Sequence, residues 1–245
     1  MRSLKGNAPI PTVWIYIFCF AVLVSLVPAE AEEPMAKIIK VGGTVWARSE
    51  IKAPVGEWVL IKTGEYPLYS GDTVKTSGGR TEILFHRDQS VISLVEDTQV
   101  LLRQTEEKGI ILRRIFLSLG WVCCTINPRT GLETQIESNA ATAVVRGAMI
   151  QYWLDSAGTA FIPCIDGGVD VMANGVTIHL IPGQCTRATP RSEPSPPFDC
   201  VAPPCPTVEG LELEKPATGG PAPVFVAPSP LFQGTGGGGI ASPHK

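Results

Sequence analysis

The sequence predicts an all-β fold, built either as two packed antiparallel sheets of the sandwich or jelly-roll kind or as a compact β-solenoid. Between residue 36 and residue 188, short runs rich in Val, Ile, Thr and aromatic residues alternate with Gly, Asn, Asp and Pro. Asp166-Gly167-Gly168 and Asn174-Gly175 are typical of hairpin turns, because positive φ costs little there. No stretch shows a long apolar period of 3.6 residues with helix caps. Regular short strands with turns favour these architectures.

The first strand is expected in AKIIKVGGTVWA, residues 36–47, where Ile39, Val41, Val45 and Ala47 share one face. In chain order, the later strand signals are TEILFH (with Ile83 and Phe85 on one side), SVISL, QVLLR, GIILRRIFLSL, GWVCCTI, ETQIES, TAVVRGAMIQYWL, TAFIPCI, VDVMA and VTIHLI.

The stretch GDTVKTSGGRTEILF, residues 71–85, has glycines beside Lys75 and Arg80, as a phosphate-binding loop does. Such a loop follows the pattern G-x-x-x-x-G-K-[ST] and opens a helix. Here the Lys-Ser/Thr pair is missing and a strand signal follows, so no helix N-terminus is available to hold phosphate. We interpret Gly71-Asp72 and Gly78-Gly79 as turns at the two ends of a short strand, TVKT.

The chain is expected to be exported. Arg2 and Lys5 precede an uncharged apolar run at residues 14–27, and Ala29 and Ala31 follow in an A-x-A arrangement. This order is typical of a secretory signal peptide over residues 1–31, cleaved after Ala31. The alternative is an uncleaved anchor, although the run is shorter than the roughly 20 residues of a spanning helix. Either way, we expect the β domain, residues 36–188, to be periplasmic or secreted.

Residues 189–245 differ in composition from the rest of the chain, because Pro, Ser, Ala and Gly dominate. Pro limits helix and strand, and the apolar content is too dilute for a core, so we expect an extended or disordered tail. This tail is either a plain disordered end or a tether that binds a partner.

The cysteines agree with export. Outside the leader there are six, an even number, and in an oxidising compartment they are candidates for disulfides with 15 conceivable connectivities. Cys123 and Cys124 are adjacent, so on a strand they face opposite sides and cannot pair with each other. Cys200 and Cys205 are close enough in sequence to close a small loop. The candidate cysteines are Cys123, Cys124, Cys164, Cys185, Cys200 and Cys205.

Charge and motifs exclude several function classes. The formal net charge is −3 and no basic stripe stands out, so nucleic acid is not an expected partner. A zinc site has little support, because no C-x-x-C occurs and none of the three histidines lies beside a cysteine. No hydrolase motif occurs, and His86-Arg87-Asp88 stands at a strand end before a turn. We therefore expect no enzyme, no cofactor and no metal.

The order of short motifs along residues 37–187 resembles the FecR domain, the periplasmic portion of regulators of the ferric-citrate type. No single piece is specific, but the ordered set is fairly strong. Two positions depart from the family pattern, since Gln89 stands where Gly is usual and Ala148 where Thr is usual. The matching pieces are Gly43-Thr-Val45, Trp58, Gly71-Asp-Thr-Val-Lys-Thr76, Asp88-Gln-Ser90, Leu119-Gly-Trp-Val122, Val145-Arg-Gly-Ala148, Gly168-Val-Asp-Val171 and Pro182-Gly-Gln184.

The resemblance implies a role in signalling between proteins. In the full regulators this domain receives a signal from an outer-membrane transporter and passes it to a cytoplasmic segment that controls a sigma factor. Only about 13 residues precede the apolar run here, so direct control of a sigma factor is not expected. We expect a stand-alone, exported FecR-like module that binds an envelope protein, with an outer-membrane receptor as one candidate. The alternative is a module that binds carbohydrate or peptidoglycan.

Several residues are candidates for a site. The family-motif positions, which we interpret as mainly structural, are Gly71, Asp72, Thr76, Asp88, Arg146 and Gly147. Trp46, Trp58, Trp121 and Trp153 are candidates for a sugar-stacking surface, although such residues more often fill a sheet core or its rim. Lys75, Arg80, Arg113 and Arg114 are candidates for a basic patch, although most charged residues on strands belong to solvated faces.

Overall fold

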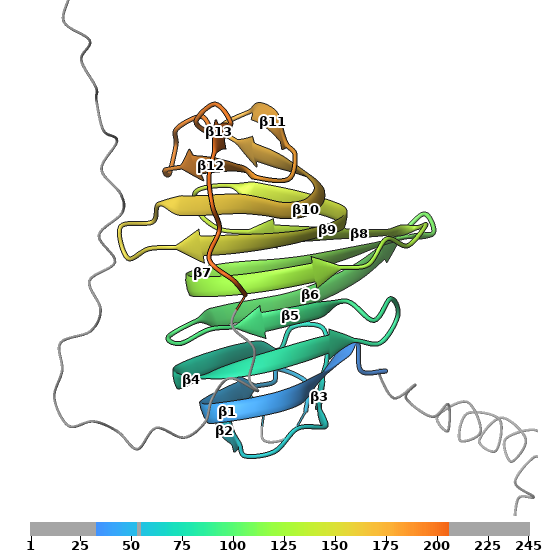
Figure 1. Ribbon diagram of the computed structural model, residues 1–245. Helices are drawn as coiled ribbons and strands as arrows, with labels where there is room; N and C mark the ends of the chain where they lie inside the picture. Colours follow the sequence, from blue (N-terminus) through green and yellow to red (C-terminus); the bar gives the residue numbers. More distant parts are fainter. Residues whose placement is uncertain (1–32, 53–54, 206–245) are drawn as a thin grey trace, which may run out of the picture. The chain divides into compact units, whose positions relative to one another are not determined.

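The computed structural model describes residues 33–52 and 55–205, and this part of the chain is all β, with no helix (Figure 1). The expected signal peptide and residues 206–245 of the expected tail lie outside the described residues. No helix among the described residues could cross a bilayer. The strands are β1 (Ala36–Arg48), β2 (Trp58–Ile61), β3 (Tyr66–Leu68), β4 (Thr73–Phe85), β5 (Val91–Leu94), β6 (Gln99–Glu107), β7 (Ile110–Ile126), β8 (Leu132–Glu137), β9 (Thr142–Leu154), β10 (Ala160–Ala173), β11 (Val176–Leu180), β12 (Gln184–Ala188) and β13 (Phe198–Asp199).

The strands form two packed layers, which confirms the all-β prediction. The layers are not separate sheets, because β1, β4, β7, β9 and β10 each pair with different neighbours along their two halves. Layer I contains β2, the second half of β1, the first half of β4, β6, the first half of β7, β8, the first half of β9, the second half of β10, and β11. Layer II contains β3, the first half of β1, the second half of β4, β5, the second halves of β7 and β9, the first half of β10, β12 and β13.

Along the molecule the strands follow roughly their order in the sequence, from β1 to β13 (Figure 1). Hairpin neighbours pair in most cases, so the connectivity is that of a folded, stacked ribbon and not of a jelly roll. The pair β7–β8 is parallel, whereas every other pair among the described strands is antiparallel. The core lies between the two layers and includes Ile38, Phe85, Ile115 and Ile150, each fully buried.

Glycines allow the long strands to bend from one layer to the other. Gly78-Gly79 was expected to be a turn but lies inside β4, and Asp166-Gly167-Gly168 was expected to be a hairpin but lies inside β10. Both predictions were wrong because a glycine pair can bend a strand without ending it. The segments 109–119 and 120–126, expected as two strands, likewise form one strand, β7, that bends at Gly120. The Asn174-Gly175 turn does connect β10 to β11, as predicted.

The bends also change which residues face the core. In β1 the register shifts between Ile38 and Lys40 and again between Gly42 and Thr44. Ile38 and Val45 are therefore fully buried, whereas Ile39 is only half-buried. The prediction that Ile39 shares the inward face with Val45 was wrong. The first shift places one extra residue in β1 and so reverses the alternation of its side chains, whereas at the second shift the extra residue lies in β4.

Candidate functional site

The outer edge of β2 is an exposed apolar edge of layer I. β2 pairs with β1 on one side, and no other described strand pairs with it. Trp58 and Leu60 point to the same face and are 39% and 40% exposed, and the preceding segment adds Ile51 and Val55, 47% and 62% exposed. An unpaired strand edge with large exposed apolar side chains is a template for pairing with another chain.

Two further features shape this edge. The guanidinium carbon of Arg48 lies 5.1 Å from the centroid of the Trp58 ring and covers one of its faces. A shallow hollow of about 360 Å³ lies beside β2 and is lined by residues 59–67. The edge therefore offers main-chain donors and acceptors, one apolar face and an adjoining hollow.

The motif Gly71-Asp72 forms the turn that leads into β4. The Tyr69 amide donates a 2.9 Å hydrogen bond to Oδ2 of Asp72, and the Gly71 amide donates to the Leu102 carbonyl at 2.7 Å. Burial raises the pKa of Asp72, more than the hydrogen bonds from Ser49 and the Tyr69 amide lower it. The hydroxyl of Thr76 donates to the Val95 carbonyl at 2.5 Å. These contacts tie β4 to its neighbours and do not present reactive groups.

Asp88 forms a buried ion pair with Arg113, whose side chain is fully buried. The two nitrogens of Arg113 donate to the Asp88 carboxylate at 2.8 and 3.1 Å, and its guanidinium lies 3.8 Å from the centroid of the Phe85 ring. Burial alone would raise the pKa of Asp88, but hydrogen bonds from Arg113 and Ser90 outweigh it and hold that pKa below its usual range. Gln89, which replaces the usual Gly, adopts a φ of 56° in this turn.

This pair contradicts the basic patch and explains why His86-Arg87-Asp88 does not form a catalytic arrangement. Arg113 points into the core between the layers, so it cannot contribute to a surface. Nε of Arg114 lies 3.5 Å from Oε1 of Glu137, and a terminal guanidinium nitrogen of Arg80 lies 3.9 Å from Oε1 of Glu96. Their charges are balanced by neighbouring carboxylates, so no basic surface forms from these side chains.

Arg146 lies in a row of charged side chains on the outer face of layer I. Its two terminal nitrogens donate to Glu133 and Asp170, each at 2.9 Å, and Asp170 also contacts Nδ1 of His179 at 2.8 Å. The hydrogen bond with His179, together with that from Arg146, lowers the pKa of Asp170. The row joins β8, β9, β10 and β11 across the sheet. Gly147 lies at the bend of β9, where a Cβ would come 2.9 Å from the Pro128 side chain.

The tryptophans do not form one surface. Trp121 and Trp153 pack against each other on layer II, with ring centroids 4.5 Å apart and planes tilted by 43°. Phe161 meets Trp153 edge-on at 6.1 Å. Trp46 and Trp58 lie instead on β1 and β2 in layer I. The sugar-stacking prediction therefore has at most two tryptophans in any one place, and the pair on layer II is tilted.

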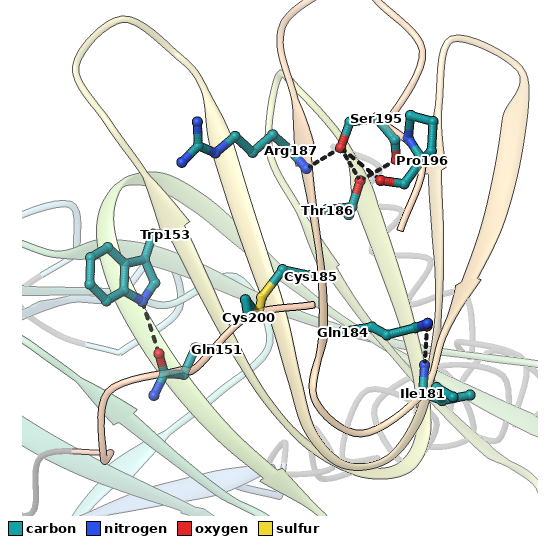
Figure 2. Close-up of a disulfide and its surroundings, with 10 residues drawn as sticks. All are labelled: Gln151, Trp153, Ile181, Gln184, Cys185, Thr186, Arg187, Ser195, Pro196 and Cys200. Atoms are coloured by element: carbon teal, nitrogen blue, oxygen red, sulfur yellow. Dashed lines mark hydrogen bonds between the residues drawn. A yellow bond between two sulfur atoms is a disulfide. The ribbon is translucent and has the colours of Figure 1, made fainter. Parts of the chain in front are cut away.

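The cysteines join the start of the expected tail to the β domain. Cys185 pairs with Cys200 and Cys123 pairs with Cys205, while Cys124 and Cys164 are buried free thiols (Figure 2 shows the first pair). The expected loop between Cys200 and Cys205 is therefore not formed. The chain up to Cys205 is held on the domain, and β13 pairs with β12, whereas the sequence placed the boundary at residue 188. Proline content suggested a loose tail but gave no sign of the two anchors.

Metal binding has no support in the part of the chain that the structure describes. No group of three or more His, Cys, Asp or Glu side chains among those residues is placed to hold an ion.

The part of the chain that the structure describes combines a two-layer β fold with an exposed edge strand, β2. Residues 72–170 match the model of the FecR protein family, so this part of the chain is a FecR domain, and the resemblance predicted from the sequence is confirmed. The matched residues run from the Gly71-Asp72 turn to Asp170, through the Asp88–Arg113 pair and the bend at Gly147.

The comparisons with solved structures and curated proteins give only distant similarity or no match. Two crystal structures, at 1.65 and 2.50 Å resolution, of a "putative anti-sigma factor" from Parabacteroides distasonis align with TM-scores of 0.44 and 15% identity. Each alignment covers 52% of this chain and 59% of that protein, so the match spans well under two thirds of its length. A search of curated proteins gave no match.

Proposed function

We propose that this protein is a non-catalytic, extracytoplasmic FecR-like binding module that recruits an envelope protein through the edge of β2. The observation that carries the proposal is this edge, which is unpaired in the described chain and exposes Trp58 and Leu60 on one face. A partner that lays an extended segment along β2 would complete its hydrogen bonds and cover these two side chains. The FecR domain supports a protein as the partner, with an outer-membrane receptor as one candidate.

The test is site-specific photo-crosslinking in cells that export the full, tagged chain. A photoreactive residue at Leu60 is compared with the same residue at Thr177, an exposed position on β11 at the far end of the stack. We expect one dominant envelope protein to be captured from position 60 and not from position 177. Equal capture from both positions would contradict the β2 edge. Capture of glycan or wall material alone would contradict a protein partner and favour the carbohydrate alternative.

Export is tested separately by mass spectrometry of the purified protein. Cleavage after Ala31 gives a mature chain that begins at Glu32. A chain that keeps its first residues and fractionates with membranes would support the uncleaved anchor. A full-length chain that stays in the cytoplasm would contradict the envelope role.

A further inference from the structure

One transverse row on the outer face of layer II is buried although it faces away from the core. The row runs across four strands, from Cys185 on β12 through Pro163 on β10 and Gln151 on β9 to Cys123 on β7. Cys185 and Gln151 are fully buried and Cys123 is only 4% exposed. The next row of the same face, which contains Trp121, Trp153 and Phe161, is partly exposed. Something therefore covers this one row.

The cover is the strap, which we define as residues 200–205. It runs down across the strands of layer II after β13 (Figure 1). Its first residue is bonded to Cys185 and its last to Cys123, the two ends of the row, with Cα–Cα distances of 5.9 Å in both disulfides. Its sequence, CVAPPC, restricts the backbone, because Pro fixes φ and disfavours helical geometry in the residue before it.

The length of the strap matches the width of the row. Three strand spacings separate the strands of Cys185 and Cys123, about 14 Å at the usual spacing of neighbouring strands. Five residue steps in polyproline II geometry span about 15 Å. A proline-rich segment therefore bridges the two cysteines without slack, whereas a helical turn would be too short.

Gln151 supplies the polar contact at the middle of the row. Its Nε2 donates a 2.5 Å hydrogen bond to the Pro203 carbonyl and lies 3.6 Å from Sγ of Cys205. Its Oε1 accepts a 3.2 Å hydrogen bond from Nε1 of Trp153, which orients the amide (Figure 2). A donor aimed at a prolyl carbonyl beside aromatic rings is the arrangement by which proteins recognise polyproline II segments.

The two ends of the strap are held unequally. At Cys200 the disulfide is reinforced by the bond from its amide to the Gly183 carbonyl, by the β12–β13 pairing and by the stacking of Phe198 on Phe161. For residues 201–205, the described contacts are the Cys123–Cys205 disulfide and the hydrogen bonds from Gln151. Opening that one disulfide would leave the strap attached at Cys200 and free at its far end.

We propose that this row is a binding site for polyproline II segments. In the disulfide-bonded protein the chain's own strap fills it. When a dithiol reductant opens Cys123–Cys205, the row accepts a proline-rich segment of a partner protein. The proposal is independent of the β2 edge, which belongs to layer I.

The opening step is a thiol–disulfide exchange. One thiolate of the reductant attacks Sγ of Cys205, the more exposed of the two cysteines, and forms a mixed disulfide while Cys123 leaves as a thiolate and takes up a proton. The second thiol of the reductant then displaces Cys205, and the reductant becomes the disulfide. Two electrons pass from the reductant to the Cys123–Cys205 pair.

The first test is graded reduction of the folded, full chain followed by alkylation and peptide mass mapping. We expect Cys123 and Cys205 to be labelled at lower dithiothreitol concentrations than Cys185 and Cys200, with the far-ultraviolet circular dichroism unchanged. Cys124 and Cys164 serve as internal controls for folding, because they are buried free thiols. Earlier opening of Cys185–Cys200, or labelling only together with Cys124 and Cys164, would overturn the releasable strap.

The second test measures binding of a fluorescent peptide, FDSVAPPS, which copies residues 198–205 with serine for both cysteines. The proteins are the oxidised full chain and a full chain with Cys205→Ser, Pro203→Gly and Pro204→Gly, whose own strap competes weakly. We expect at least tenfold tighter binding to the variant, and the control peptide FDSVAGGS to bind more weakly than FDSVAPPS. Adding Gln151→Leu should weaken binding about fivefold or more, because one hydrogen bond is lost.

Two results would overturn the site. One is equal affinity of the peptide for the oxidised full chain and for the variant. The other is the absence of binding to the folded variant up to about 1 mM peptide, the effective concentration that a short tether typically supplies. If the variant does not fold, the same titration on wild-type protein reduced as in the first test decides the question.

Discussion

At the scale of single residues, two buried carboxylates differ because of what surrounds them. Asp88 receives two hydrogen bonds from a fully buried guanidinium, which favours its charged form. Asp72 has amide and hydroxyl donors, and burial favours its neutral form. The sequence marked both as motif positions and gave no sign of this difference, because the partner of Asp88 lies 25 positions along the chain, at Arg113.

Asp88→Asn is expected to lower the free energy of unfolding by about 3–5 kcal/mol, because it leaves the Arg113 charge buried without its partner. Asp72→Asn is the matched control, and it should change that free energy by less than about 1 kcal/mol, because an amide oxygen can still accept the Tyr69 hydrogen bond. Urea denaturation at pH 7 measures both. Equal losses in the two variants would show that the ion pair has no special role.

The stability should fall in acid for the same reason. The pKa of Asp88 is lowered from its ordinary value of 3.8 in the folded protein, so the ion pair contributes fully above that value and is lost as pH falls through the folded pKa. The raised pKa of Asp72 acts in the opposite direction, since protonation there favours the folded state. Unfolding free energies measured from pH 7 down to pH 2 should decline below about pH 4. Asp88→Asn should flatten this decline, and an unchanged slope in that variant would contradict the assignment.

At the scale of elements, the bends decide how strands become layers. In β4 the two adjacent glycines have different roles. Gly78 has a φ of 59° and open space around its Cα, so its requirement is conformational. Gly79 lies against β1, and a Cβ there would meet the Thr44 amide nitrogen at 2.7 Å. Gly78 therefore allows the bend of the backbone, and Gly79 allows the close approach of β4 to β1.

Gly79→Ala should be the more damaging of the two substitutions. Its methyl group would push against the backbone of β1, which cannot move without breaking ladder hydrogen bonds, so we expect a loss of about 2–3 kcal/mol. Gly78→Ala should cost about 1–2 kcal/mol, because alanine is strained at positive φ but meets no neighbour. Thermal and urea unfolding of the two variants provide the comparison. A larger loss of stability in Gly78→Ala than in Gly79→Ala would contradict the close contact between Gly79 and β1.

At the scale of the whole molecule, the register of β7, β9 and β10 keeps Cys124 and Cys164 too far apart to form a disulfide. Cys124 and Cys164 both oppose Ile150, from β7 on one side and β10 on the other. Two strand spacings, about 10 Å, separate their backbones, and a disulfide spans less than about 7 Å. Burial also raises the pKa of Cys164, to about 11, and that of Cys124 further.

We therefore expect the two free thiols among the described residues, Cys124 and Cys164, to stay unreactive in the folded protein. Under native conditions, iodoacetamide should leave Cys124 and Cys164 unlabelled, and both should react when the protein is unfolded in urea without reductant. Mass spectrometry of the labelled peptides distinguishes them from the four bonded cysteines. A disulfide between Cys124 and Cys164, or rapid native labelling of either, would contradict the register of β7, β9 and β10.

The sequence by itself determined the fold class and the likeness of residues 72–170 to the FecR family. Alternating short runs identified strands such as β5 and β11, because residues on one face of a strand recur with period two whatever lies beyond it. The ordered glycine, aspartate and arginine motifs identified the FecR domain, because they are local requirements of turns and bends. Adjacent Cys123 and Cys124 were also placed on opposite faces correctly, for the same local reason.

The tertiary structure alone decided where the bends lie and what the strap does. A short glycine-containing turn signal occurs both in hairpins and in bent strands. Only the pairing of the neighbouring strands distinguishes the hairpin at Asn174-Gly175 from the bend at Gly78-Gly79. The partners of Asp88 and of Cys205 lie 25 and 82 positions away, so no local pattern could name them. A proline-rich sequence predicts a stiff segment but does not predict which strands it contacts. The disulfides to Cys185 on β12 and to Cys123 on β7 hold residues 200–205 on the domain, where the sequence predicted a loose tail.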